Sequence, residues 1–368
     1  MQKKIIALAV AGLVSGAAFA DGSSVTVYGI ADVTFDTVST SGGTAAGAKT
    51  GNYTRVSSNS SYLGFKGSED LGNNLKAVFQ FESGVTADAG GGASMFGNAR
   101  DTYVGLAGGF GQVALGTLTA PTRLLGTQID VNAGATGIGS NAALLSSKTQ
   151  TAGTVGAVDF DSRQGNAIAY STPNMSGFGA TVAYVSGENK TKDSVVAKAN
   201  ASAWDLGATY NNGPILVGLT YADLKARDVA NTDVKNTRLA GSFNFGQGSV
   251  RALWNQLKGD NSTGYGKVTT WGLGGTLNAS ANGKLIAQYY KANDVKSNTG
   301  DVANSGAKQF ELGYEHSLSK RTMIKAVYAR VSNDSAAAYN FYINGVNNVT
   351  ANPGVDPSGL QVGIRHAF

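Results

Sequence analysis

The chain has 368 residues, a formal charge of +5, 51 glycines and no cysteine. Without cysteine there is no disulfide framework and no thiolate metal site, and the charge is too mild to indicate a nucleic-acid-binding protein. The mean hydropathy is −0.09, and no segment after the first twenty residues is apolar for the roughly 20 residues that a spanning helix needs, which excludes a helical membrane protein. Glycine at about twice its ordinary usage is typical of many short strands joined by tight turns.

Residues 1–20 have the pattern of a secretory signal peptide. Lys3 and Lys4 precede an apolar stretch over 5–14, and Ala18-Phe-Ala20 supplies the small residues that a signal peptidase reads. The apolar stretch is too short for a membrane anchor. We therefore expect cleavage after Ala20 and a single domain over 21–368. That domain carries 27 basic and 24 acidic residues, a charge of about +3.

Short and long connections alternate along the rest of the chain. Seven tight turns are expected near 68–73, 107–110, 173–177, 212–214, 246–248, 279–283 and 317–321. Eight longer polar stretches lie between and beyond them, near 38–53, 87–97, 119–162, 188–200, 225–233, 259–267, 294–306 and 333–358. Each long stretch joins two strands, which predicts sixteen strands. Strict alternation of this kind is typical of a transmembrane barrel with periplasmic turns and extracellular loops.

Within the strands, apolar and polar residues alternate. Around Arg238 and Glu311 the pattern is clear, and the last nine residues repeat it up to the terminal Phe368. Side chains of a strand alternate between its two faces, and a charge at the lipid midplane costs about 2–4 kcal/mol, so the charged face must be the lumen. The edge of a soluble β-sandwich also alternates. Tyr289, Tyr290, Phe341, Tyr342 and Phe368 are candidates for the interfacial aromatic girdle.

Several motifs, in this order, resemble the general-diffusion porins of Gram-negative bacteria, most closely the betaproteobacterial type. They are Val25-Thr-Val-Tyr-Gly29, Leu63-Gly-Phe-Lys-Gly-Ser-Glu-Asp-Leu-Gly72, Leu75-Lys-Ala-Val-Phe-Gln-Phe-Glu-Ser-Gly84, Arg100-Asp-Thr-Tyr-Val-Gly-Leu106, Phe110-Gly-Gln-Val-Ala-Leu-Gly116, Ser317-Leu-Ser-Lys-Arg-Thr322 and Arg365-His-Ala-Phe368. The resemblance implies an all-β, 16-stranded antiparallel barrel in the outer membrane, with an inward-folded third extracellular loop. It also implies a homotrimer, passive diffusion of small hydrophilic solutes and ions, and Phe368 as a signal to the barrel assembly machinery.

The resemblance also indicates where the pore narrows. The stretch 119–162 corresponds to the inward loop, whose acidic residues would face basic residues of the wall. Asp130 is nearest to the family's acidic position, and Asp159 and Asp161 lie at the loop exit. Of three family arginines only Arg100 is kept, because Tyr62 and Thr117 stand at the other two positions. Lys66 could replace charge at a different height, and Arg123 and Arg163, which flank the loop, are further candidates. Two bases, Arg100 and Lys66, against the acid Asp130, together with the excess charge of about +3, predict a mild anion preference. An ordinary solvated surface loop is the alternative.

Further charges should face the lumen by alternation. They are Asp32, Glu82, Asp205, Arg238, Arg251, Glu311 and Arg365, and each is as suited to a structural ion pair as to contact with a solute. The two histidines, His316 and His366, lie at the expected periplasmic rim. There is no Gly-x-Ser-x-Gly elbow and no metal-spaced cluster, so neither an enzyme nor a cofactor is expected. A substrate-specific channel and a plugged or adhesive barrel remain alternatives to a general pore.

Overall fold

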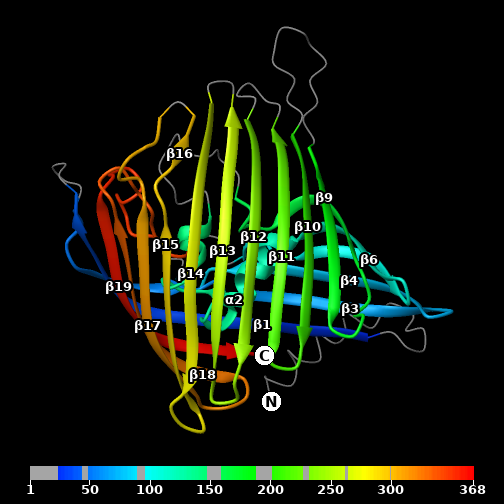
Figure 1. The fold of residues 1–368 in the computed structure, drawn as a ribbon. Helices are drawn as coiled ribbons and strands as arrows, with labels where there is room; N and C mark the ends of the chain where they lie inside the picture. The colour runs from blue at the N-terminus through cyan, green and yellow to red at the C-terminus, as the bar shows by residue number, and fades with distance from the viewer. Residues whose placement is uncertain are drawn as a thin grey trace.

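The chain forms a closed antiparallel barrel that is filled at mid-height by a loop (Figure 1). The structure, a computed structural model, describes residues 24–43, 49–88, 96–146, 159–187, 201–226, 232–261, 264–298 and 300–368. The expected signal peptide, residues 1–20, lies outside them.

All strands belong to one sheet in which neighbours are antiparallel. The strands are β1 Ser24–Gly42, β2 Tyr53–Ser58, β3 Tyr62–Gly72, β4 Leu75–Val85, β5 Phe96–Ala99, β6 Thr102–Gly108, β7 Gly111–Leu118, β8 Gln164–Ser171, β9 Phe178–Ser186, β10 Ala201–Asn212, β11 Ile215–Ala226, β12 Thr232–Asn244, β13 Gly248–Asn261, β14 Gly264–Asn278, β15 Gly283–Ala292, β16 Lys296–Ser297, β17 Ala307–Ser317, β18 Thr322–Asn333 and β19 Val355–Ala367. β2 and β3 both pair with β1, β5 and β6 with β4, and β15 and β16 with β14. With each such pair counted as one wall strand, the described residues form the sixteen strands expected from the sequence.

The barrel closes where the first and last strands pair. β1 and β19 run antiparallel from Ile30 opposite Ala367 to Gly42 opposite Val355. Beyond this ladder, the backbone N–H of Phe368 donates to the carbonyl oxygen of Gly29 at 3.1 Å, and the N–H of Gly29 donates back at 3.2 Å. A Cβ on Gly29 would lie 2.5 Å from the ring of Phe368. The terminal aromatic residue is therefore seated in the closing seam.

The two faces of the wall have the composition predicted from alternation. Large apolar side chains such as Leu239 and Phe310 are exposed on the outside, whereas the charged neighbours Arg238 and Glu311 are fully buried inside. These two charges therefore lie on the inner face of the wall. The prediction of an interfacial aromatic girdle is wrong for Tyr290, Phe341 and Tyr342, because these side chains lie inside the barrel and not on its outer face. Tyr290 and Phe341 are 1% and 2% exposed and belong to the buried core inside the barrel.

Six of the seven tight turns lie where they were predicted, whereas the first falls at 73–74, because most of the predicted 68–73 is the end of β3. All seven lie at one end of the barrel (Figure 1). At the other end, the long polar stretches differ in what they become. The stretch 259–267 mostly continues β13 and β14, so that only 262–263 separates them, and the stretch 333–358 folds inward with Ala337 and Ala338 buried. Polar composition marks water-facing strand ends as well as loops, which is why the sequence could not separate the two.

The described residues contain three short helices, all inside the barrel. They are α2 Pro121–Ile129, the 3₁₀ helix η1 Ala133–Ala135 and α3 Ala142–Leu145. None of the helices in the described ranges has the length and apolarity needed to cross a membrane.

Candidate pore constriction

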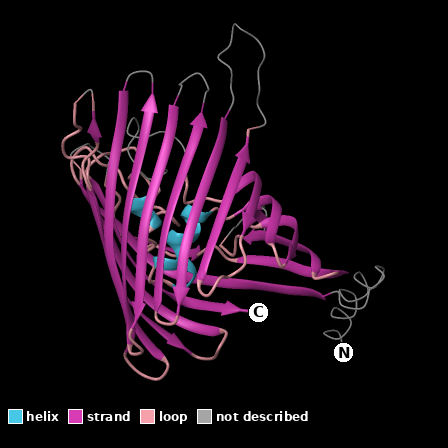
Figure 2. Cartoon of the chain, turned by 45° about the vertical axis from the view of Figure 1, so that its right-hand side comes forward, coloured by secondary structure: helices cyan, strands magenta, loops and turns pink. Residues whose placement is uncertain are grey.

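The longest internal loop spans residues 119–162, and its described parts, 119–146 and 159–162, lie inside the barrel. Figure 2 shows its helices within the ring of strands. Pro121 opens α2, where a missing N–H costs no hydrogen bond. Several apolar side chains of the loop are buried, among them Leu125 and Ile129 in α2 and Leu144 in α3. The loop therefore has a core of its own and is not an ordinary solvated surface loop.

Two lumenal charges of the wall hold the ends of this loop. Arg238 on β12 forms two parallel hydrogen bonds of 2.8 Å with the carboxylate of Asp161, and it donates to the carbonyl oxygen of Thr122 at 2.7 Å. Asp205 on β10 accepts from the backbone N–H of Thr122 at 3.1 Å and from its hydroxyl at 2.8 Å. A Cβ on Gly126 would lie 2.4 Å from the guanidinium of Arg238. Glycine there lets α2 approach the wall this closely.

Asp130 is placed differently from the expectation. It is 2% exposed and faces the wall behind the loop. Its carboxylate accepts from the backbone N–H groups of Asn132 at 2.9 Å and Asn141 at 2.7 Å, and from Gln288 at 3.4 Å. Burial raises the pKa of Asp130, and Arg251 on β13 donates to its backbone carbonyl oxygen. Asp130 thus fastens the loop and does not oppose Arg100 across the passage.

The other lumenal charges are also engaged in structural contacts. Asp32 on β1 forms ion pairs with Lys325 at 2.7 Å and with Arg365 at 3.4 Å. Glu311 on β17 accepts from the side chain of Asn132 at 3.0 Å. These contacts link β1 to β18 and β19, and β17 to the loop. The structural interpretation of these residues is the one that the geometry supports.

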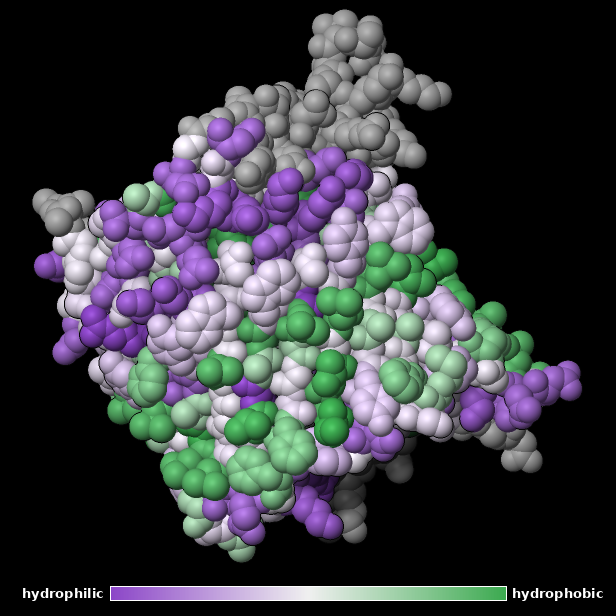
Figure 3. Space-filling view, in the orientation of Figure 1, coloured by the Kyte–Doolittle hydropathy of each residue, from purple (hydrophilic) through white to green (hydrophobic). Residues whose placement is uncertain are grey.

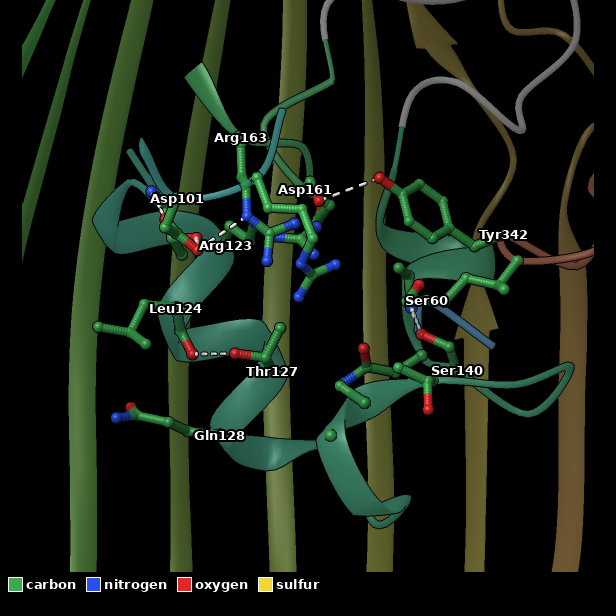
Figure 4. A pocket seen from close by; sticks show the side chains of 18 of the residues that line it. Ser60, Asp101, Arg123, Leu124, Thr127, Gln128, Ser140, Asp161, Arg163 and Tyr342 are labelled. Carbon is green, nitrogen blue, oxygen red and sulfur yellow. Dashed lines mark hydrogen bonds and ion pairs between the residues drawn. The ribbon is translucent and has the colours of Figure 1, made fainter. Parts of the chain in front are cut away.

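The space left beside the loop is a cavity of 490 Å³ between α2 and the wall strands near β3 to β6 (Figure 4). Three arginines line it: Arg100 from the wall, Arg123 from α2 and Arg163 from the loop exit. Two acids, Asp101 and Asp161, also line it. The uncharged part of the lining includes Ser60, Gln80, Tyr103, Thr119, Leu124, Thr127, Gln128, Ser140, Tyr342 and Ile343. We call this cavity, with its three arginines, the constriction.

The acids of the constriction are already paired. Arg100 forms an ion pair with Glu82 at 3.2 Å, and Arg163 forms one with Asp101 at 2.8 Å. Asp161, the other acid in the lining, forms an ion pair with Arg238. Arg123 has no ion-pair partner among the residues that the structure describes. The positive charge of Arg123 is therefore not neutralised by a neighbouring side chain.

Tyr62, Lys66 and Thr117 do not line this cavity. The guanidinium carbon of Arg100 lies 4.3 Å from the centre of the Tyr62 ring, so Tyr62 supports the arginine from behind. Lys66 lies over Tyr28, at 4.9 Å, and lines a different cavity of 270 Å³. Thr117 stands at a bulge in β7. Of the expected basic residues, the structure brings together Arg100, Arg123 and Arg163.

Comparison with known proteins agrees with this architecture. The profile of the family described as Gram-negative porin matches residues 7–336. The chain belongs to the Gram-negative porin family. This porin is 36% identical over 372 residues to outer membrane porin protein 32 of Delftia acidovorans, with both chains fully covered. It is 29% identical to the major outer membrane protein P.IB of Neisseria meningitidis, over 88% of this chain and 91% of that one.

A solved structure shows the same fold. The anion-selective porin from Comamonas acidovorans superposes with a TM-score of 0.78 at 32% identity, over 94% of this porin and all of that chain. Membership establishes an outer-membrane β-barrel that acts as a channel and not as an enzyme. In the described part of the porin, no group of three or more histidine, aspartate or glutamate side chains could hold a metal ion.

Among the residues of the constriction that sequence reasoning missed, Asp101 and Tyr342 make polar contacts with its charged groups. Asp101 could have been found, since it follows Arg100 directly within the family motif. Tyr342 gave no such signal, because it reaches the lumen only through the fold of the last loop. Its hydroxyl donates to Asp159 at 2.9 Å and to the carbonyl oxygen of Asp161 at 3.0 Å. Burial and the neighbouring Asp161 raise the pKa of Asp159.

Proposed function

We propose that this porin is a general-diffusion channel for small hydrophilic solutes with a mild preference for anions. The observation that carries the proposal is the composition of the constriction, where three arginines meet two acids that are both engaged in ion pairs. Charges in a narrow passage are screened less than charges on an open surface. The charge of about +3 on residues 21–368 acts in the same direction.

The relatives give independent support. The Comamonas acidovorans protein, similar in sequence over nearly its whole length, is described as anion-selective. A second, more distant barrel of the same fold, OmpT of Vibrio cholerae, has been solved in a trimer form. We include a homotrimer in the proposal, with outer-membrane lipid around it and the barrel assembly machinery recognising the end at Phe368.

Planar-bilayer recording tests the proposal. With more salt on one side of the membrane, an anion-preferring pore gives a reversal potential of the sign set by chloride, and stepwise closure in three equal levels reports a trimer. A reversal potential of the opposite sign would overturn the anion preference. Conductance too small for a water-filled passage would instead favour the substrate-specific or plugged barrel.

A further inference from the structure

A second cavity lies beside the inward loop, on the side of the tight turns. It has a volume of 280 Å³ and lies between α2 and the inner face of β7 to β11. Its lining reaches Thr172, next to the tight turn at 173–177, and it includes Leu124 and Gln128 of α2, which also line the constriction. A solute in the passage therefore meets this space directly next to the constriction. We call it the turn-side cavity.

Small residues of the wall make room for the turn-side cavity. Phe178 is 58% exposed on the outside, so Gly179 beside it faces the lumen. A Cβ on Gly179 would find its nearest atom, the hydroxyl oxygen of Thr209, 3.8 Å away. Ala114 on β7 and Ala169 on β8 stand opposite each other in the same wall. The space in front of Gly179 is therefore open, and no large side chain of this strand enters it.

The polar part of the lining is uncharged. Among the described residues that line the cavity, Asp101 is the single charged one, and it is paired with Arg163 at 2.8 Å. The other polar side chains are hydroxyls and amides from α2 and from five wall strands, namely Gln112, Gln128, Ser171, Thr181, Thr209 and Thr220. An ion finds no free counter-charge here, and burying a charge without a partner is costly. The cavity therefore favours a neutral solute, in contrast to the constriction.

Two of these polar groups are free to bind a solute. Within the described ranges, neither the hydroxyl of Thr209 nor the amide of Gln128 has a hydrogen-bond partner. Ser171 and Thr181 bond each other at 2.9 Å, and a hydroxyl oxygen keeps further acceptor capacity. Figure 4 shows Gln128 extending from α2 away from Tyr342. The cavity thus offers hydrogen-bond donors and acceptors from both the loop and the wall.

Apolar groups lie among these hydroxyls. Pro121 and Leu125 of α2 line the cavity, and a Cβ on Gly207 would lie 2.6 Å from the Cβ of Pro121, so the helix rests directly on the wall. On the outside of the same strands, Leu206 and Leu219 are exposed, and Figure 3 shows hydrophobic side chains over the middle of the outer face. The polar groups of the cavity are therefore reached only through the lumen.

We propose that the turn-side cavity binds an uncharged, polyhydroxylated solute of the size of a monosaccharide. Such a solute has hydroxyls for Thr209 and Gln128, and C–H faces for Pro121 and Leu125. The volume of 280 Å³ lies just below the usual range of about 300–1,000 Å³ for small-molecule sites, which limits the occupant to one small ring. The proposal rests on the proposed function only in needing an open pore, and it does not depend on the ion preference.

The test uses the full porin in planar bilayers, with D-glucose as the probe. The conductance of the unaltered porin should fall and level off as glucose is added. Triethylene glycol, of similar size but with hydroxyls only at its ends, should lower the conductance only in proportion to the viscosity of the solution, because a site built to bind hydroxyls rejects a solute that lacks them. Conductance before any addition shows separately whether the pore is open. If glucose gives no saturable fall, or triethylene glycol saturates equally, the proposal is overturned.

Two variants locate the site, and heat-modifiable migration on gels checks that each is folded. Thr209→Val should weaken glucose binding by about twofold to tenfold, as expected for the loss of one hydrogen bond. Gly179→Leu fills the open space and should abolish the saturation. The matched control is Thr26→Val, which removes a hydroxyl from the separate cavity near Lys66 and should bind like the parent. Equal loss in Thr26→Val and Thr209→Val, or unchanged binding in Gly179→Leu, would overturn the proposal. The comparison of glucose with triethylene glycol on the unaltered porin needs neither variant.

Discussion

The guanidinium of Arg238 and the carboxylate of Asp161 face each other in a bidentate ion pair, at 2.8 Å for both contacts, with Arg238 fully buried. One residue belongs to the wall and the other to the exit of the inward loop. The pair therefore fixes the exit of the loop to the wall.

Replacing Arg238 with methionine should loosen the loop. The change leaves Asp161 buried without its counter-charge, which costs about 3–5 kcal/mol. We expect a lower unfolding temperature and noisier single-channel current. The double variant R238M/D161N should recover part of the loss, while Arg321→Met, in an exposed turn, serves as the control. If R238M unfolds at the same temperature as the control, the pair does not anchor the loop.

Replacing Arg123 with glutamine should shift the reversal potential towards cations. A unit charge at about 4 Å in water changes the energy of a passing ion by about 1 kcal/mol, so we expect the anion-to-cation permeability ratio to fall by up to about fivefold. Arg100→Gln should act in the same direction. Lys66→Gln is the matched control, since this lumenal lysine lies outside the constriction. If Lys66→Gln shifts the reversal potential more than R123Q does, the constriction does not lie at Arg123.

Replacing Asp130 with asparagine should leave ion selectivity nearly unchanged. Its carboxylate is buried behind the loop and does not line the passage. The sequence alone suggested the opposite result. A marked increase in anion preference in D130N, at unchanged conductance, would show that the Asp130 carboxylate faces the passage.

Removing Phe368 should sharply lower the yield of folded protein in the outer membrane. The deletion takes away both backbone hydrogen bonds to Gly29 in the closing seam, and unsatisfied backbone groups in lipid cost several kcal/mol each. Phe368→Tyr keeps the aromatic ring and should assemble well. Heat-modifiable migration on gels measures both, and equal yields for the deletion and the parent would contradict this prediction.

The stability of the loop should depend on pH through Asp159. Its folded-state pKa is raised by burial, so the folded state holds the proton more tightly than the unfolded chain does. Stability is then greatest below the ordinary aspartate value of about 3.9 and falls as pH rises from there through the raised pKa. Asp159→Asn should flatten this fall in unfolding temperature. Asp301→Asn is the control, because the pKa of exposed Asp301 is lowered by Lys296.

Some strands could be read from the sequence and others could not. Around Trp204 and Leu239 the apolar residues face lipid and the polar residues face the lumen, so the sequence shows which face of each strand points outward. From Met323 to Val331 the sequence does not show this, because the apolar residues Val327 and Val331 face the lumen, where they are 2% and 0% exposed. There the inward-folded loops fill the barrel and make the inner face apolar too. Alternation fails wherever the lumen is packed with protein instead of water.

The sequence by itself determined the class of the protein. Alternating strands, short turns and long loops behind a secretory leader predict a closed barrel, which satisfies every backbone hydrogen bond in a bilayer, and the motifs from Val25 to Phe368 resemble one family. The tertiary structure alone decided which charges face the passage. Asp130 and Arg123 both belong to the inward loop, yet one is buried against β15 and the other lines the cavity. That difference depends on how the loop packs against strands more than a hundred residues away, and local pattern carries no information about it.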